Sequence, residues 1–172
     1  MPLLDEIEAA IPALRRYAMA LVRDATRADD LVQDCLERAV AKRHLWRGDG
    51  PLQAWLFRIL INRHRDLLRA SPLPGHLVAV DDLLHEPAVA GTQDGHMALR
   101  EVHAAMGRLP VDQREALLMV AIGGKTFDQA AHILDIPKGT LMSRIARARA
   151  TLRVLTGRGD ATPQAQTKPG NN

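Results

Sequence analysis

The feature that most constrains this chain is a pair of adjacent helical patterns in residues 126–153, separated by a short break. Thr126 is followed three residues later by Gln129, a spacing typical of a helix start. After the break Asp-Ile-Pro at 135–137, an apolar stripe repeats at helical spacing through Leu141, Ile145, Ala148, Leu152 and Leu155. Two short helices joined by a tight turn predict a helix-turn-helix.

The second of these helices is basic and carries no acid. Its basic residues are Lys138, Arg144, Arg147, Arg149 and Arg153. Helical spacing turns Thr140, Ser143 and Arg147 away from the apolar stripe and puts Arg144 on its border. Short polar and arginine side chains near the start of a second helix suit the base edges of a DNA major groove. A helical hairpin with a solvated basic face would show a similar pattern.

Composition favours helices and a protein without a membrane span. Aromatic residues make up 3% of the chain, so the core must consist mostly of Leu, Ala, Val and Ile. The single cysteine, Cys35, excludes an internal disulfide and argues against a cysteine-based zinc site. The N-terminus is acidic, unlike a signal peptide, and no apolar run approaches the length of a membrane span. We therefore expect a soluble cytoplasmic protein with no metal or other cofactor and no membrane insertion.

Charge alternates in blocks along the chain. Residues 5–37 hold eight acids and four bases, and residues 38–69 hold eight bases and two acids. Residues 81–115 hold seven acids and three bases, and residues 137–158 hold six bases and no acid. Two separate basic blocks indicate two contacts with a polyanion, although solvated helix faces would also explain them.

Helical periodicity divides the chain into two parts. It dominates residues 5–69, fades in a segment rich in proline and glycine, and resumes over 96–155. The sequence therefore predicts an all-α fold with two small helical domains joined by a flexible linker. The predicted boundaries are a first domain at 1–70, a linker at 71–95, a helix-turn-helix domain at 96–157 and a disordered tail at 158–172.

The first domain is expected to contain four helices. They are a stretch over 5–23 split near Pro12, a helix from about Thr26 to Leu45, and a helix over 52–69 that follows the turn sequence Arg-Gly-Asp-Gly. Helical spacing gives the last helix an apolar face and an opposite polar face without acids. The polar face consists of Arg58, Asn62, Arg65 and Arg69.

Three aromatic residues lie in the same basic block as that helix. They are Trp46, Trp55 and Phe57. Arginines that hold a phosphate backbone, together with rings that stack on bases, suit single-stranded nucleic acid. Core packing is the alternative for Trp55 and Phe57, and it is the favoured one for Trp55. Trp46, beside the glycine-rich turn, is the better stacking candidate.

Three stretches together resemble a bacterial sigma factor of the extracytoplasmic-function (ECF) group, within the sigma-70-like proteins. RADDLVQDCLERAV (27–40) resembles the polymerase-binding helix of that family. RGDGPLQAWLFRILINRHRDLLR (47–69) resembles its promoter-melting loop and helix, and the stretch from Leu109 to Arg153 resembles its duplex-reading domain. These stretches cover 82 of the 172 residues and follow one another in the family's order. Cys35 departs mildly from the family, which often has threonine nearby.

The resemblance implies a function in transcription initiation, without bond chemistry, and three binding surfaces. Core RNA polymerase would contact Asp29, Asp30, Gln33, Asp34 and Glu37. The minus-10 strand of promoter DNA would contact Trp46, Arg47, Gly48, Asp49, Arg58, Asn62 and Arg65, within and beyond a base-holding loop that ends at Pro51. The minus-35 duplex would contact Lys138, Thr140, Ser143, Arg144 and Arg147. An anti-sigma factor is expected to capture a compact form by inserting between the domains, since the linker is long enough for packed and extended arrangements.

Three other classes of protein fit this sequence less well. A sigma-like decoy would bind an anti-sigma factor without touching DNA, but such decoys usually carry a receiver domain and a degraded arginine face. A simple helix-turn-helix regulator would leave the polymerase-like helix unexplained. An enzyme fits least, because the seven histidines are scattered and His96 and His103 are seven residues apart, not at the i,i+4 spacing of a helical metal pair.

Overall fold

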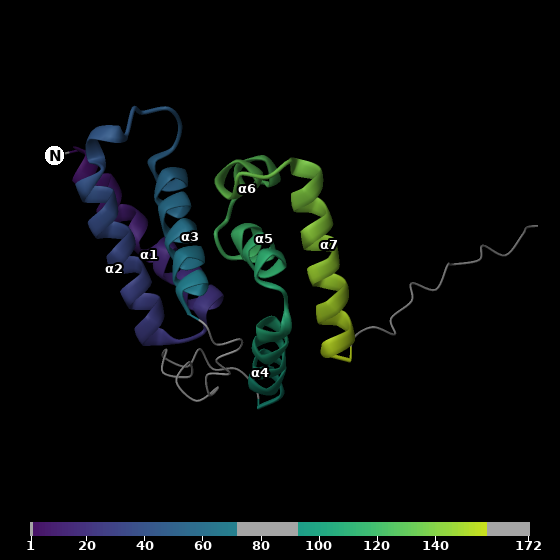
Figure 1. Ribbon diagram of the computed structural model, residues 1–172. Helices are drawn as coiled ribbons and strands as arrows, with labels where there is room; N and C mark the ends of the chain where they lie inside the picture. Colours follow the sequence, from purple (N-terminus) through teal and green to yellow (C-terminus); the bar gives the residue numbers. More distant parts are fainter. Residues whose placement is uncertain (1, 72–92, 158–172) are drawn as a thin grey trace, which may run out of the picture.

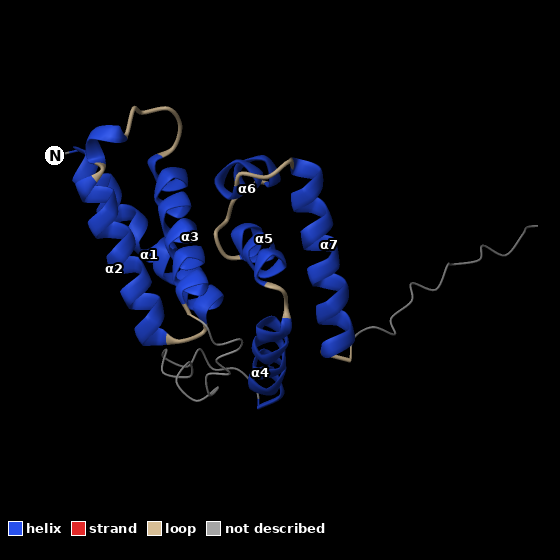
Figure 2. Cartoon of the chain, in the orientation of Figure 1, coloured by secondary structure: helices blue, strands red, loops and turns tan. Residues whose placement is uncertain are grey.

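The structure is a computed structural model that describes residues 2–71 and 93–157. All regular secondary structure in these two ranges is helical, which confirms the predicted all-α class (Figure 2). The elements are α1 (Pro2–Val22), α2 (Ala25–Ala41), the single 3-10 turn η1 (Arg43–Leu45), α3 (Leu52–Ala70), α4 (Gln93–Arg108), α5 (Val111–Ala121), α6 (Phe127–Leu134) and α7 (Lys138–Leu155).

The first group of helices, α1 to α3, packs around aliphatic and aromatic side chains. Each of the three helices contacts the other two. Leu14, Leu56 and Leu60 are fully buried, as are Tyr17 and Phe57, whose rings meet edge to face with centroids 5.3 Å apart. Phe57 is therefore a core residue, the alternative that the sequence left open.

The predicted split of the first helix near Pro12 is wrong, because α1 runs unbroken through this residue. Proline inside a helix removes one hydrogen bond to the carbonyl four residues earlier. Pro12 and Glu8 are both exposed, so water can hydrogen-bond to the freed carbonyl of Glu8. The first group therefore has three α-helices and a 3-10 turn rather than four helices.

The second group contains the predicted helix-turn-helix in α6 and α7. The Thr126 hydroxyl accepts a hydrogen bond from the Gln129 amide, and the Gln129 side chain accepts one from the Thr126 amide. Asp135 ends α6 in the left-handed conformation (φ 55°), and Pro137 immediately precedes α7. Leu141, Ile145 and Ala148 bury the apolar stripe of α7 against α5 and α6.

Replacing Thr126 by alanine is expected to lower the free energy of unfolding by about 1 kcal/mol, because it removes the acceptor that satisfies a helix N-terminal amide. Denaturant unfolding of the full chain measures this change. Thr26→Ala is the matched control, since Thr26 is exposed in α2 and the cap of that helix is Asp24. A loss of equal size in both variants would contradict the capping role of Thr126.

The two groups pack directly against each other through α1 on α5 and α3 on α6 (Figure 1). The helix α7 lies on the side of the second group that faces away from α1 to α3. The first described range ends at Ser71, after α3, and the second begins at Gln93 with α4. The helix α4 therefore begins three residues before the predicted domain start at 96. The rest of the predicted linker and the predicted tail from 158 onward lie outside the described residues.

Across residues 2–71 and 93–157, no helix has the length and apolar character that crossing a bilayer requires.

Candidate functional site

The N-terminal half of α7 presents the residues predicted to read a duplex. Ser143 and Arg147 are exposed, Thr140 is half-buried, and all three leave the apolar stripe free to pack inward. The Ser143 hydroxyl donates to the Gly139 carbonyl at 3.0 Å, which fixes its orientation along the helix. Arg147 forms no ion pair with any described residue, so its guanidinium is available to a phosphate or a base.

Two other residues of this predicted set are held by acids of their own group. The Lys138 ammonium lies 2.9 Å from a carboxylate oxygen of Asp128, and Arg144 Nε lies 3.3 Å from one of Asp112. Arg144 is half-buried, in agreement with its predicted place on the border of the apolar stripe. Ion pairs of this exposed kind contribute little to stability, so an incoming phosphate can compete for both cations.

The loop between η1 and α3 carries the next predicted set. Gly48 and Gly50 have φ angles of 75° and 109°, conformations that side-chain-bearing residues rarely adopt. Arg47 and Asp49 are exposed, and the loop extends beyond the ends of α2 and α3 (Figure 1). Trp46 is half-buried and packs on Trp55 with ring centroids 5.5 Å apart. The contact with Trp55 therefore anchors Trp46 at the start of the loop, while part of its ring stays accessible to solvent.

Two arginines of the polar face of α3, which the resemblance implies would contact DNA, are bound by the second group of helices in this structure. Arg58 Nη2 donates to the His132 carbonyl of α6 at 2.6 Å, and Arg65 pairs with Glu115 of α5. Both arginines are half-buried between the two groups, whereas Asn62 is exposed. The helical pattern could not show this, because the partners of these arginines come from the second group, more than 45 residues away in sequence.

Glu115 is the centre of the contact between the groups. Its side chain is 2% exposed. Its Oε2 accepts hydrogen bonds from Arg65 Nε at 3.1 Å and Nη2 at 2.8 Å, and its Oε1 accepts a longer one from Arg65 Nε at 3.4 Å. His64 Nδ1 lies 3.5 Å away, and the Tyr17 hydroxyl donates to the Glu115 backbone carbonyl at 3.2 Å. Burial raises the pKa of Glu115, but His64 and Arg65 at the carboxylate lower it by more, so the pKa lies below its ordinary value.

Sequence reasoning missed Glu115, although one signal was present. All residues from Glu115 to Met119 are buried, because α5 is covered by α1 on one side and by α6 and α7 on others. An apolar run without a polar face predicts a helix buried all round. An acid at the edge of such a run must find a cation, and the run itself was visible as Ala-Leu-Leu-Met.

The acidic surface of α2 is exposed but partly paired. Asp29 binds Arg15 of α1 at 2.8 Å, and Asp34 binds Arg63 of α3 at 2.7 Å. The helix is capped by Asp24, whose carboxylate accepts a hydrogen bond from the Arg27 amide. The exposed remainder consists of Asp30 and of Gln33 hydrogen-bonded to Glu37 at 3.1 Å.

Cys35 lies in the core beneath this surface. Its thiol donates to the Leu56 carbonyl, and burial raises the pKa of Cys35 to about 12. A thiol that stays protonated is a poor nucleophile and a poor metal ligand. Among the residues that the structure describes, no group of three or more His, Cys, Asp or Glu side chains is placed to hold a metal ion.

Two families of protein domains match the chain. Residues 7–61 match the family described as "Sigma2 domain of PhyR", and residues 99–152 match "Sigma-70, region 4". The first match covers most of α1 to α3 and the second most of α4 to α7.

Two relatives match the chain over most of its length. The ECF RNA polymerase sigma factor EcfG of Rhodopseudomonas palustris is 39% identical over 158 residues, which cover 89% of this chain and 84% of that protein. The ECF RNA polymerase sigma factor SigM of Mycobacterium tuberculosis is 35% identical, over 84% of this chain and 71% of its own length.

A solved structure agrees with both. The sigma factor RpoE of Bartonella quintana, crystallised with the anti-sigma factor NepR, has a TM-score of 0.71 and 31% identity, over 89% of this chain and 95% of that one. The likeness therefore extends across both groups of helices. With its two matched domains and these relatives, the chain belongs to the ECF group of RNA polymerase sigma factors.

Proposed function

We propose that this protein binds core RNA polymerase through α2, holds the minus-10 strand with the loop at 46–51 and Asn62, and reads the minus-35 duplex with the start of α7. The observation that supports this proposal best is the exposed, unpaired Arg147 beside Ser143 on the second helix of a helix-turn-helix. The protein performs no bond chemistry and acts in the cytoplasm, where the polymerase works.

Arg58 and Arg65 join the minus-10 surface only when the two groups separate. In the packed arrangement their guanidiniums bind His132 and Glu115, so a DNA phosphate would have to displace those contacts. The protein consequently binds promoter DNA in an open arrangement. Core polymerase supplies the surface that replaces the packing between the groups.

An anti-sigma factor holds the packed arrangement in this proposal. The likeness to RpoE of Bartonella quintana, which was solved with NepR, covers both groups of helices and so supports such an arrangement. CnrH, solved with the cytosolic domain of CnrY, gives a TM-score of 0.67 at 28% identity. The sequence predicts that the inhibitor inserts between the two domains. Because α1 and α3 contact α5 and α6 directly, we propose instead that it lies across the two groups.

Run-off transcription with purified core polymerase, on promoters from the protein's own genome, tests the proposed function. The full chain is expected to give discrete transcripts that core polymerase alone does not produce. If no promoter responds while an anti-sigma factor still binds the chain, the decoy interpretation takes the place of this one.

Arg147→Ala is expected to weaken promoter binding by the reconstituted holoenzyme by about 1–3 kcal/mol and, if Arg147 contacts a phosphate, to reduce the salt dependence by about one ion. Fluorescence anisotropy over a salt series measures both quantities. Arg153→Ala is the matched control, since Arg153 is exposed near the far end of the same helix. Equal effects of the two substitutions would show that α7 contributes general charge and no specific contact.

A further inference from the structure

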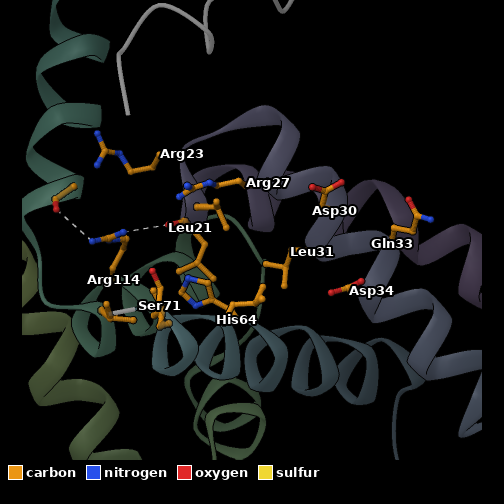
Figure 3. A pocket seen from close by; sticks show the side chains of 15 residues that line it. Leu21, Arg23, Arg27, Asp30, Leu31, Gln33, Asp34, His64, Ser71 and Arg114 are labelled. Atoms are coloured by element: carbon orange, nitrogen blue, oxygen red, sulfur yellow. Dashed lines mark hydrogen bonds between the residues drawn. The ribbon is translucent and has the colours of Figure 1, made fainter. Parts of the chain in front are cut away.

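Basic side chains from both groups gather where α1 ends, α2 begins and α4 meets α5. Arg23, Arg27 and Arg114 line one end of a cavity of about 780 Å³, and Asp30, Gln33 and Asp34 line the other (Figure 3). The wall between the two ends is mostly apolar. Its residues are Leu21, Val22, Leu31, Leu67, Leu68 and Val111.

The basic end has more donors than acceptors. The Arg114 terminal nitrogens donate to the backbone carbonyls of Leu21, Gly107 and Leu109, at 3.1–3.3 Å. Nε of Arg114, Nε of Arg23 and both ring nitrogens of the neighbouring His103 are buried without a hydrogen-bond partner. No carboxylate within the described ranges forms an ion pair with Arg23 or Arg27.

The neighbouring cations also disfavour one another. Burial lowers the pKa of Arg23, and burial followed by the charge of Arg23 lowers the pKa of Arg114. The charge of Glu115 offsets part of this effect on the pKa of Arg114, whereas no described carboxylate pairs with Arg23. Guanidiniums that lose water and repel each other destabilise the fold around them. An anion among them would remove both costs.

The backbone holds Arg23 at this place despite a local cost. Arg23 lies between α1 and α2 with a φ of 64°, a left-handed conformation that costs a non-glycine residue free energy. Its guanidinium fits against Gly107 of α4, where a Cβ would overlap it. The left-handed backbone of Arg23 and the absence of a Cβ at Gly107 together allow the Arg23 guanidinium to pack against α4.

We propose that the basic end of this cavity is a binding site for a small oxyanion, a phosphate or carboxylate group on a small molecule whose apolar part lies along the cavity wall. Arg23 and Arg27 provide the charge from the first group and Arg114 provides it from the second, with His103 near Arg23 outside the cavity lining. Because such a ligand touches both groups, it stabilises their packed arrangement. The site does not depend on the promoter-binding residues.

Titration of the full chain with inorganic pyrophosphate and with citrate, at an ionic strength held constant with sodium chloride, tests the proposal. Calorimetry and thermal unfolding are the two readouts. We expect saturable binding of at least one oxyanion and a rise in the unfolding temperature. A preference for pyrophosphate or for citrate identifies the ligand as a phosphate or a carboxylate compound.

Variants separate this site from general attraction of anions to a basic protein. Arg23→Gln with Arg27→Gln is expected to weaken the oxyanion at least tenfold, and Gly107→Ala, which displaces the Arg23 guanidinium without changing charge, is expected to weaken it as well. Arg149→Gln with Arg153→Gln removes the same charge from exposed positions of α7 and should keep the response. Equal weakening in the two double variants, or no saturable response to either oxyanion, overturns the proposal.

Discussion

Replacing Asp30 and Asp34 together by arginine is expected to lower the affinity for core RNA polymerase at least a hundredfold. Asp30 is exposed and forms no ion pair with a described residue, and Asp34 is half-buried beside Arg63. Replacing two carboxylates by guanidiniums on one helix face would place positive charges against a basic surface of the polymerase, at a cost of several kcal/mol in binding free energy. Binding of labelled core polymerase to the purified variant measures the loss.

A control variant must distinguish the effect of the position of these charges from the effect of the change in net charge. Glu8→Arg with Glu101→Arg changes the net charge by the same amount at exposed positions of α1 and α4, and it is expected to leave polymerase affinity within a few fold. Asp30→Asn with Asp34→Asn tests the same surface without placing a new cation beside Arg63. If the double arginine variant keeps its helical circular-dichroism spectrum and still binds polymerase as tightly as the native chain, α2 is not the polymerase-binding surface.

The helices of this protein are predictable because their determinants are local. The Thr126–Gln129 capping pair, the turn before Pro137 and the apolar stripe of α7 each depend on residues within one or two helical turns. Such signals act within a short stretch of chain and do not depend on how the rest of the molecule folds. The error at Pro12 has the same origin, because a local rule ignores that an exposed carbonyl can bind water.

The contact between the groups is not predictable in this way. The sequence pattern of α3 shows a basic face with no acid, and the family resemblance implies that Arg58 and Arg65 contact DNA. The structure places a carbonyl of α6 and the carboxylate of Glu115 against them. The residues of α3 give no indication of those partners, which lie in α5 and α6. A single sequence therefore does not distinguish a DNA-binding face from a face that packs against another domain. The acidic and basic blocks predict that partners exist without saying which block meets which.

Replacing Glu115 by glutamine is expected to separate the two groups of helices while leaving each folded. Removal of one member of a buried charge pair leaves Arg65 without its carboxylate, a cost on the order of 2 kcal/mol for a partner that is one-third exposed, or about thirty times less of the packed form. The amide keeps the shape of the side chain, so packing within α5 changes little. Distance measurements between labels on α2 and α7, by double electron–electron resonance, should show a longer and broader distribution.

Three comparisons decide whether the charge pair itself closes the molecule. Asp112→Asn removes an exposed carboxylate from the same helix, whose partner Arg144 belongs to the same group, and should not change the label distances. Arg65→Met combined with Glu115→Leu removes both charges and should restore part of the packed population, because no uncompensated charge stays buried. Since the open form frees Arg58 and Arg65, Glu115→Gln should also speed the assembly of holoenzyme. Unchanged label distances in Glu115→Gln, with the chain less stable overall, would show instead that Glu115 holds the fold of α5 and does not govern the opening of the protein.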